Sequence, residues 1–312
     1  MNIIQWDGKK ISKPGFYSGV PLKDYHSGNL CVGPSVSSSG LRTILAKSEA
    51  HFWDQWPLNP KHDPDAQKET ESLILGRATH HILLREPLFS SEYVVRHDGD
   101  VWPDAKGTMG PWNGNKHSCQ KWIEDQHYRG LTILTSDGMA RVRGMAMSLA
   151  KQPLVQAGAL NGVIELTLAW QDKATGVWCL ARPDVIPTDS ADVVDLKTTT
   201  SVAALDVQRT VSEYRYHQQG AMVGEGFRAI TGQRMASFSL YFIESDRPFC
   251  PFLYRLHDDD LERGRRLNEV AMHRFVKAFN TGVWPGPGGV QSAERTLRIS
   301  DRVREIEERL LT

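Results

Sequence analysis

The sequence predicts a mixed α/β or α+β fold in which a central β-sheet is flanked by helices. Two patterns support this class. Segments with apolar residues three and four positions apart, typical of amphipathic helices, occur in both halves of the chain. Short runs rich in β-branched residues lie between them and are bounded by polar residues, as strands are. With 312 residues, the chain can bury a full hydrophobic core in one large or two small domains.

Residues 1–70 are expected to form an N-terminal extension that is partly irregular and partly helical. Residues 1–36 are rich in Gly, Pro and Ser, which indicates an irregular segment or a short hairpin. The serines at 37–39 can cap a helix expected over 40–56, where the apolar spacing is helical. The polar stretch that follows predicts a loop.

Residues 71–284 are expected to form the core domain. Their apolar spacing predicts helices over 71–84, 137–150, 202–230 and 258–279. Short apolar runs predict strands over 163–171, 177–186, 191–197, 236–244 and 252–256, with turns at 172–176 and 188–190. Glycines and prolines over 97–118 predict a mobile surface loop, with a disordered insertion as the alternative.

Residues 285–312 are expected to form a basic tail that ends in a helix over 303–311. This helix is either solvated, or it contacts another subunit or DNA.

The charge balance excludes a global polycation. Lys and Arg number 37 and Asp and Glu number 37, so the formal net charge is zero and any nucleic-acid site must be a local basic surface. The first ten residues lack the apolar core of a signal peptide. No apolar run approaches the ~20 residues that span a bilayer. We therefore expect a cytoplasmic protein without a membrane partner.

The cysteines are scattered along the chain and form no Cys-x-x-Cys pair. They are Cys31, Cys119, Cys179 and Cys250. This distribution indicates reduced thiols and predicts that the protein holds no iron–sulfur cluster.

Two aspartates and a lysine on consecutive predicted strands are the main candidates for chemistry. Asp184 lies on the first of these strands, and Asp195 and Lys197 lie on the next. Side chains alternate along a strand, so Asp195 and Lys197 share a face, and antiparallel pairing can bring Asp184 beside Asp195. Like charges this close resist joint ionisation, and a bound Mg²⁺ or Mn²⁺ removes that cost. Lys197 can then orient or help deprotonate a water that attacks a phosphodiester.

Three further residues are candidates for the same site. Glu165 lies near the start of the first predicted strand and is either a metal ligand or an exposed strand residue. His80 lies on the inward stripe of the helix predicted over 71–84 and is either a metal ligand or a hydrogen-bonded core residue. Gln219 can donate to a phosphate oxygen or a metal-bound water, with helix-surface solvation as the alternative.

Candidate DNA contacts are less specific. Arg182 can bind a phosphate through two donors, but it can equally pair with an acidic neighbour. Tyr216 lies on the same helix as Gln219 and either packs in the core or touches DNA. Trp112, in the predicted loop, can stack on a base.

These residues resemble a known family of nucleases. The pattern Pro183-Asp184 followed by Asp195-Leu196-Lys197 resembles the PD-(D/E)xK signature. The residues over 214–221 are similar to the Tyr-x-Tyr-His-x-Gln helix of RecE-type phage and prophage exonucleases, the exonuclease VIII group.

Two upstream segments extend the resemblance to the RecE-type group. Residues 76–80 resemble its Gly-x-x-x-His helix, and Tyr25-His26 with residues 37–41 resembles its opening segment. Val223 departs from the family helix, which often carries a tyrosine four residues after the glutamine.

The resemblance implies a PD-(D/E)xK core with the order helix, three antiparallel strands, helix, strand, preceded by helical N-terminal additions. It implies that Asp184, Asp195 and the backbone carbonyl of Leu196 hold the metal. It also favours metal roles for Glu165 and His80.

The function implied by the resemblance is that of a Mg²⁺-dependent double-stranded DNA exonuclease, with Mn²⁺ as the alternative metal. Such an enzyme resects 5′ ends in phage-type homologous recombination inside a bacterial cell. A ring-shaped homo-oligomer and a single-strand annealing partner are implied in the same way. The alternatives are a PD-(D/E)xK endonuclease and an inactive nuclease-like module that binds DNA ends or another protein.

Overall fold

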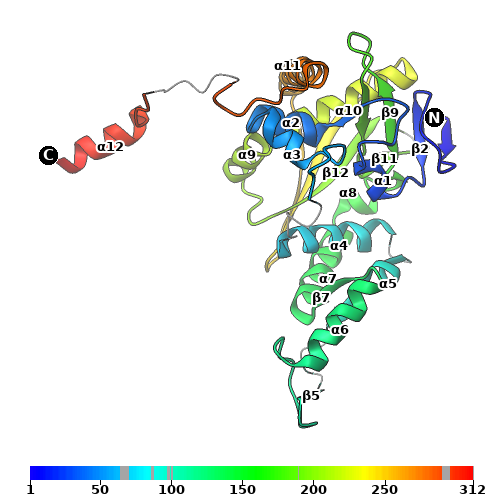
Figure 1. Cartoon of the computed structure of the whole chain (residues 1–312), viewed down its shortest axis with the longest axis vertical. Helices are drawn as coiled ribbons and strands as arrows, with labels where there is room; N and C mark the ends of the chain where they lie inside the picture. Colours follow the sequence, from blue (N-terminus) through cyan, green and yellow to red (C-terminus); the bar gives the residue numbers. More distant parts are fainter. Residues whose placement is uncertain are drawn as a thin grey trace.

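Two five-stranded β-sheets carry the fold (Figure 1). The computed structural model describes residues 1–63, 70–85, 88–96, 99, 101–188, 190–289 and 296–311. The first sheet has the order β1-β2-β9-β10-β3, formed by Ile3–Gln5, Gly15–Ser18, Thr167–Gln171, Trp178–Ala181 and Ser35–Ser37. The second has the order β14-β13-β12-β11-β8, formed by Pro251–Arg255, Ser237–Glu244, Asp192–Thr199, Val185–Pro187 and Gly162–Ile164. These mixed sheets flanked by helices confirm the predicted fold class.

Two of the predicted strands each divide between the sheets. The strand predicted over 163–171 becomes β8 and β9, because Glu165 takes a left-handed backbone conformation (φ 48°) that no strand contains. The strand predicted over 177–186 becomes β10 and β11, with the break at Pro183-Asp184. The Glu165 amide donates to the Asp184 carbonyl at 3.0 Å, so the two breaks lie side by side.

The second sheet has the pairing that the resemblance implies. β8, β11 and β12 are antiparallel neighbours, and β13 joins β12 in parallel after an intervening helical segment. β14 closes the edge as an antiparallel neighbour of β13. Asp189, in the turn predicted between β11 and β12, lies outside the described residues.

Helices cover both faces of the second sheet. One face packs against α2 (Ser38–Ala46), α10 (Tyr216–Thr231) and α11 (Asp258–Thr281), and the other against α4 (Glu71–Arg85) and α7 (Ser136–Ala150). Residues of β13 alternate between the two sides: Leu240 and Phe242 join the first cluster, and Tyr241 and Ile243 join the second. This strand is therefore buried on both faces, as its nearly continuous apolar run requires.

Two of the predicted helices are interrupted. The helix predicted over 40–56 divides into α2 and α3 (Glu49–Gln55), because the extended Ser48 caps α3 by accepting the His51 amide at 3.3 Å. The helix predicted over 202–230 divides into α9 (Ala204–Glu213) and α10, because Arg215 is left-handed (φ 53°).

The first 37 residues are more regular than expected. β2 pairs antiparallel with β9, and β3 pairs in parallel with β10, so this segment completes the first sheet on both sides. The predicted hairpin is wrong, because β1 and β2 run parallel. The short α1 (Leu22–His26) follows β2 and buries Tyr25.

Residues 88–135 form a lobe that projects away from the two sheets (Figure 1). It contains α5 (Phe89–Glu92), β4 (Tyr93–Arg96), β5 (Trp102–Pro103), β6 (Met109–Gly110), α6 (His117–Tyr128) and β7 (Thr132–Thr135). Within the predicted loop, β5 and β6 form a small hairpin, while residues 97, 98 and 100 lie outside the described part of the chain. From the lobe, α7 and α8 (Pro153–Gln156) lead back to β8.

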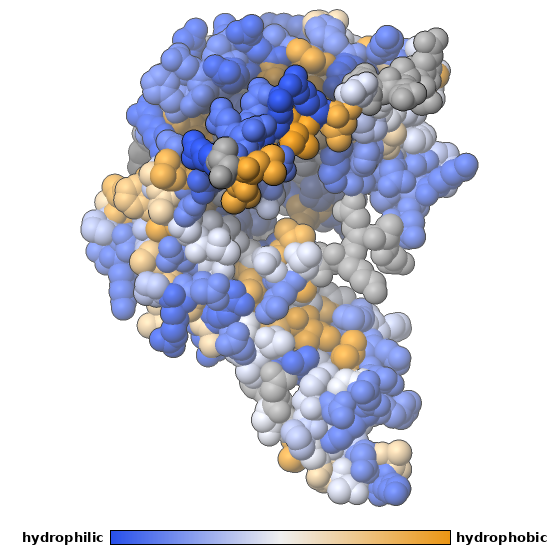
Figure 2. Space-filling view, turned by 90° about the vertical axis from the view of Figure 1, so that its left-hand side faces the viewer, coloured by the Kyte–Doolittle hydropathy of each residue, from blue (hydrophilic) through white to orange (hydrophobic). Residues whose placement is uncertain are grey.

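The C-terminal helix α12 (Asp301–Leu311) buries none of its residues. Its apolar side chains Val303, Ile306 and Leu310 are 42%, 50% and 80% exposed. Figure 2 looks onto this end of the molecule and shows hydrophobic (orange) and hydrophilic (blue) residues side by side on its surface. Among the helices of the described residues, none has the length and apolar character needed to cross a membrane.

Candidate active site

The pairing of β11 with β12 brings the two predicted carboxylates together. Val185 pairs with Val194, so Asp184 and Asp195, the next residues on each strand, lie opposite one another. The Asp195 side chain is 2% exposed and that of Asp184 is 15% exposed. As predicted, Leu196 points the other way and is buried in the cluster beneath α4 and α7.

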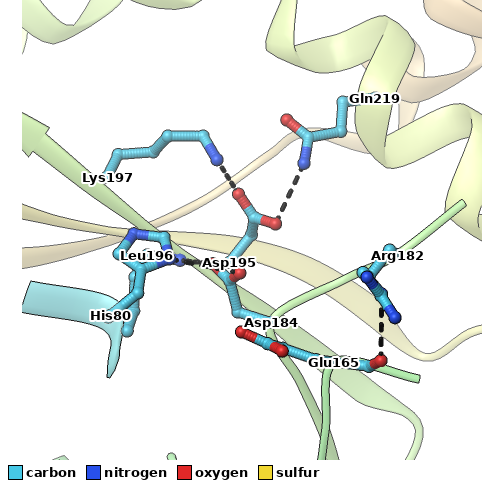
Figure 3. Close-up of polar contacts among 8 residues, drawn as sticks. All are labelled: His80, Glu165, Arg182, Asp184, Asp195, Leu196, Lys197 and Gln219. Carbon is cyan, nitrogen blue, oxygen red and sulfur yellow. Dashed lines mark hydrogen bonds and ion pairs between the residues drawn. The ribbon is translucent and has the colours of Figure 1, made fainter. Parts of the chain in front are cut away.

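Both oxygens of Asp195 accept a hydrogen bond from a side chain (Figure 3). The Lys197 ammonium donates to Oδ2 and forms an ion pair with it. Gln219 donates from Nε2 to Oδ1 at 2.9 Å. Gln219 lies in the first turn of α10. The left-handed Arg215 sets where that helix begins, and it thereby sets the direction of the Gln219 side chain.

Both carboxylate oxygens of Asp184 also have polar partners. The Leu196 amide donates to Oδ2 at 2.6 Å, and His80 Nδ1 lies 3.3 Å from Oδ1. His80 reaches this point because α4 passes close to β12, where a Cβ on Gly76 would lie only 3.2 Å from Thr198 Oγ1. Glycine at position 76 therefore supports the position of His80.

The two carboxylates have different electrostatic environments. Burial, and then repulsion from Asp184, raise the pKa of Asp195 above its ordinary value despite the nearby Lys197 ammonium. Burial also acts to raise the pKa of Asp184, but His80, Lys197 and the Leu196 amide outweigh it and hold that pKa below its ordinary value. Asp184 is therefore the more firmly ionised of the pair.

The two cationic groups are held in their charged forms by the carboxylates. Burial acts to lower the pKa of His80, yet attraction to Asp184 outweighs it and raises the pKa above 6.5. Burial likewise opposes the charge on Lys197, but Asp195 and Asp184 raise its pKa above the ordinary value.

Tyr216 lies against Lys197. The Lys197 ammonium lies 5.0 Å from the centre of the Tyr216 ring, and the Arg42 guanidinium lies 5.9 Å from the same ring. Arg42 also donates to the Tyr214 carbonyl at 2.6 Å, which ties α2 to the break before α10. Sequence reasoning missed Arg42, although it directly follows the 37–41 segment that resembles the opening of the family.

Two predicted site residues have other surroundings. Arg182 donates to the backbone carbonyls of Glu165 (3.1 Å) and Val20, and its guanidinium lies 5.1 Å from the centre of the Tyr25 ring. These contacts hold α1 against Glu165, where the chain passes from β8 to β9. They give no support to the predicted contact of Arg182 with a phosphate.

Trp112 lies in the lobe rather than at the carboxylates. The rings of Trp102, Trp112 and Trp122 lie 5.0–5.8 Å apart, and the Arg96 guanidinium lies 4.8 Å from the centre of the Trp112 ring. The structure therefore places Trp112 in an aromatic cluster, and its contact with DNA stays a prediction.

Glu165 is tied to the site through its backbone, which bonds to Asp184 as described above. Its left-handed conformation costs a non-glycine residue about 1–2 kcal/mol. Residues under such strain cluster at functional sites, so this observation favours a use for the Glu165 carboxylate.

The donors present fit a hard divalent cation. Asp184, Asp195 and the Leu196 carbonyl offer oxygen, and Mg²⁺ typically binds one or two carboxylates and completes its shell with water and substrate phosphate. Within the described ranges, no group of three or more His, Cys, Asp or Glu side chains is arranged to hold a metal.

Comparison with known proteins places this site in a family. Residues 37–296 match the model of a family described as a PDDEXK-like domain of unknown function (DUF3799). No curated protein sequence matches the chain.

The solved structures that match the chain include these two. One is a Eubacterium rectale protein provisionally described as an exonuclease, with a TM-score of 0.57 and 13% identity, covering 91% of this chain and 93% of that one. The other is an alkaline exonuclease from Laribacter hongkongensis, with a TM-score of 0.25 and 11% identity, covering 54% of this chain and 86% of that one. The first likeness supports the fold, and the second is too weak to carry an argument.

Proposed function

The chain belongs to the DUF3799 family of PDDEXK-like domains, and on this premise we propose that it is a metal-dependent nuclease that hydrolyses DNA phosphodiester bonds. One observation carries the proposal. Asp184 and Asp195 form a buried carboxylate pair with the Lys197 ammonium in contact with it. A buried pair of like charges is costly, and its value lies in binding a divalent cation.

Each residue of the cluster has a distinct task in this proposal. Asp184, Asp195 and the Leu196 carbonyl would hold Mg²⁺ or Mn²⁺, which supplies water activation and charge neutralisation on the phosphate. Lys197 orients the attacking water and offsets the negative charge that develops on the phosphate. Gln219 keeps Asp195 in place and can turn its amide toward a phosphate oxygen.

His80 and Glu165 complete the proposed site. His80 fixes one oxygen of Asp184 through its Nδ1 contact and, once a cation binds, can hold one of its waters. Glu165, at the break between the sheets, is the candidate for a further ligand once a cation is bound, since the described residues hold no preformed group of three such ligands.

More specifically, we propose a RecE-type double-stranded DNA exonuclease that resects 5′ ends in phage-type recombination. The support is the series of sequence matches that begins at Tyr25-His26 and ends at Ala221 in the family's order. A homo-oligomer, a single-strand annealing partner and a bacterial intracellular setting belong to the same proposal.

The decisive experiment compares linear and covalently closed double-stranded DNA in the presence of Mg²⁺. We expect the wild-type protein to degrade only the linear DNA and Asp195→Ala to degrade neither. Asp192→Asn is the matched control, because Asp192 lies on the same strand but is exposed and outside the cluster. Cleavage of the closed circle would favour an endonuclease. Failure to cleave either substrate, by a folded protein with Mg²⁺ or Mn²⁺, would favour the inactive binding module.

A further inference from the structure

We propose that Lys197 and the divalent cation compete for Asp195, so that metal binding displaces the Lys197 ammonium from this carboxylate onto the Tyr216 ring. This inference rests on the proposed function, because it concerns the metal at the same site. It assigns Lys197 a second role, that of an internal counter-ion that sets the metal affinity of the carboxylate pair.

The contacts of the carboxylate pair are the first support. Each of the four oxygens already accepts a donor: Lys197 and Gln219 bind Asp195, and His80 and the Leu196 amide bind Asp184. Figure 3 shows Lys197 and Gln219 converging on Asp195 from above and His80 approaching from the side. A cation that binds both carboxylates must share these oxygens with groups that already use them.

Charge is the second support. The Asp195 side chain is 2% exposed and that of Lys197 is 17% exposed, so solvent screens this pair only weakly. The Lys197 ammonium and the charged His80 already balance the two negative charges of the carboxylates. A divalent cation at the pair therefore brings an excess of positive charge, and that cation would repel an ammonium left in contact with Asp195.

Geometry indicates that Lys197, rather than Gln219, is the group that leaves. Gln219 is neutral, so a cation does not repel it as a whole. Lys197 has a flexible four-carbon stem, and the Tyr216 ring already lies 5.0 Å from its ammonium. The face of an aromatic ring attracts a cation, so Tyr216 offers a second position close to the phosphate that Lys197 is proposed to serve.

The test is metal binding to the full-length protein without DNA. Titration calorimetry with Mn²⁺ and with Mg²⁺, after chelator treatment, gives the dissociation constant for wild type, Lys197→Gln and Lys197→Arg. We expect Lys197→Gln to bind Mn²⁺ about tenfold more tightly than wild type, because one nearby positive charge is removed. Lys197→Arg keeps the charge and should show no such gain.

Thermal melting of the same proteins provides a second readout. In chelator, Lys197→Gln should melt at a lower temperature than wild type, because its buried carboxylate pair has lost its counter-ion. Saturating Mn²⁺ should raise the melting temperature of Lys197→Gln by more than it raises the melting temperature of wild type. Lys151→Gln removes an equal charge from an exposed position and controls for the change in net charge.

The outcomes separate the inference from the proposed function. If wild type binds metal and Lys197→Gln binds it with equal or lower affinity, Lys197 does not compete with the metal. That result would overturn this inference and leave the nuclease proposal intact. If neither protein bound metal and wild type failed to cleave linear DNA with Mg²⁺, both proposals would fall.

Discussion

Glu165 combines an unusual backbone conformation with a side chain that can bind metal. Its backbone turns the chain from one sheet to the other in a conformation that glycine adopts at little cost. Its backbone amide also donates to the Asp184 carbonyl, which places the residue next to one of the two aspartates. Residues held in such a conformation cluster at functional sites, and this supports the proposal of a metal role for the Glu165 carboxylate.

His80 gives a prediction for pH dependence. Its folded-state pKa lies above 6.5, so its contact with Asp184 stabilises the fold fully below the unfolded-state pKa and loses that contribution as pH rises through the folded-state pKa. In chelator, the free energy of unfolding of wild type should therefore exceed that of His80→Gln most in the acidic range below 6.5. The difference should shrink as pH rises above that value.

Urea unfolding of the two proteins over a pH series measures this difference. His257→Gln serves as the control, because the side chain of His257 is 74% exposed and lies away from the carboxylate pair. A wild-type advantage that stayed constant or grew with rising pH would contradict the assigned charge on His80.

The sequence predicted that Asp184, Asp195 and Lys197 meet, whereas Arg182 and Trp112, also predicted for the site, have other surroundings. Strand alternation and the turn between the strands were enough to bring Asp184, Asp195 and Lys197 together, because these are local features. His80 lies beside Asp184 and Gln219 lies beside Asp195, whereas their roles toward metal and DNA stay predictions. Arg42 was missed because its contacts depend on how α2 lies against α10, which periodicity does not encode.

At the scale of elements, the core helices were predicted well, whereas helix interruptions and the lobe helix α6 were not predicted. The core helices α4, α7 and α11 lie within a few residues of their predicted ranges. The interruptions at Ser48 and Arg215 could not be predicted, because the apolar spacing continues across both residues. The break at Arg215 matters most for function, since it sets the start of the helix that carries Gln219.

The crossing of α10 and α11 provides a prediction about element packing. A Cβ on Gly264 would lie 2.3 Å from the His217 carbonyl oxygen, which is backbone and cannot swing away. Gly264→Ala should therefore push the helices apart and destabilise the protein by about 1–3 kcal/mol. Urea unfolding measures the loss.

The matched control for this packing is Gly224→Ala in α10. A Cβ there would meet only the flexible end of Met235, 3.3 Å away, so the better helix propensity of alanine should leave stability equal or higher. Equal effects of the two substitutions would show that the close helix contact is not the cause.

At the scale of the whole molecule, the fold class followed from the sequence, but the division into two sheets did not. Each of two predicted strands turned out to serve both sheets, because nothing in a period-2 pattern marks the residue at which a strand bends. The N-terminal segment also proved integral to the first sheet, whose partners β3 and β10 lie far apart in the chain.

The exposed helix α12 yields a prediction for the intact chain. It buries no residue, so a protein that ends at residue 289 should melt at the same temperature as the full chain. Differential scanning calorimetry of both forms tests this expectation. A clearly lower melting temperature would mean that α12 packs against the body or against another subunit.

The position of the lobe along the chain has a consequence for how the family can diverge. The chain enters the lobe after α4 and leaves it at α7, and both of these helices pack against the second sheet, so the lobe is an insertion whose two ends are fixed in the same body. Loop-closure entropy rises only with the logarithm of length, about 0.6 kcal/mol for each doubling. We therefore expect relatives to lengthen or shorten the stretch between β4 and β7 at small entropic cost. Tyr93 and Leu134 must still pack against α4 and α7, since α4 carries His80 to the carboxylates.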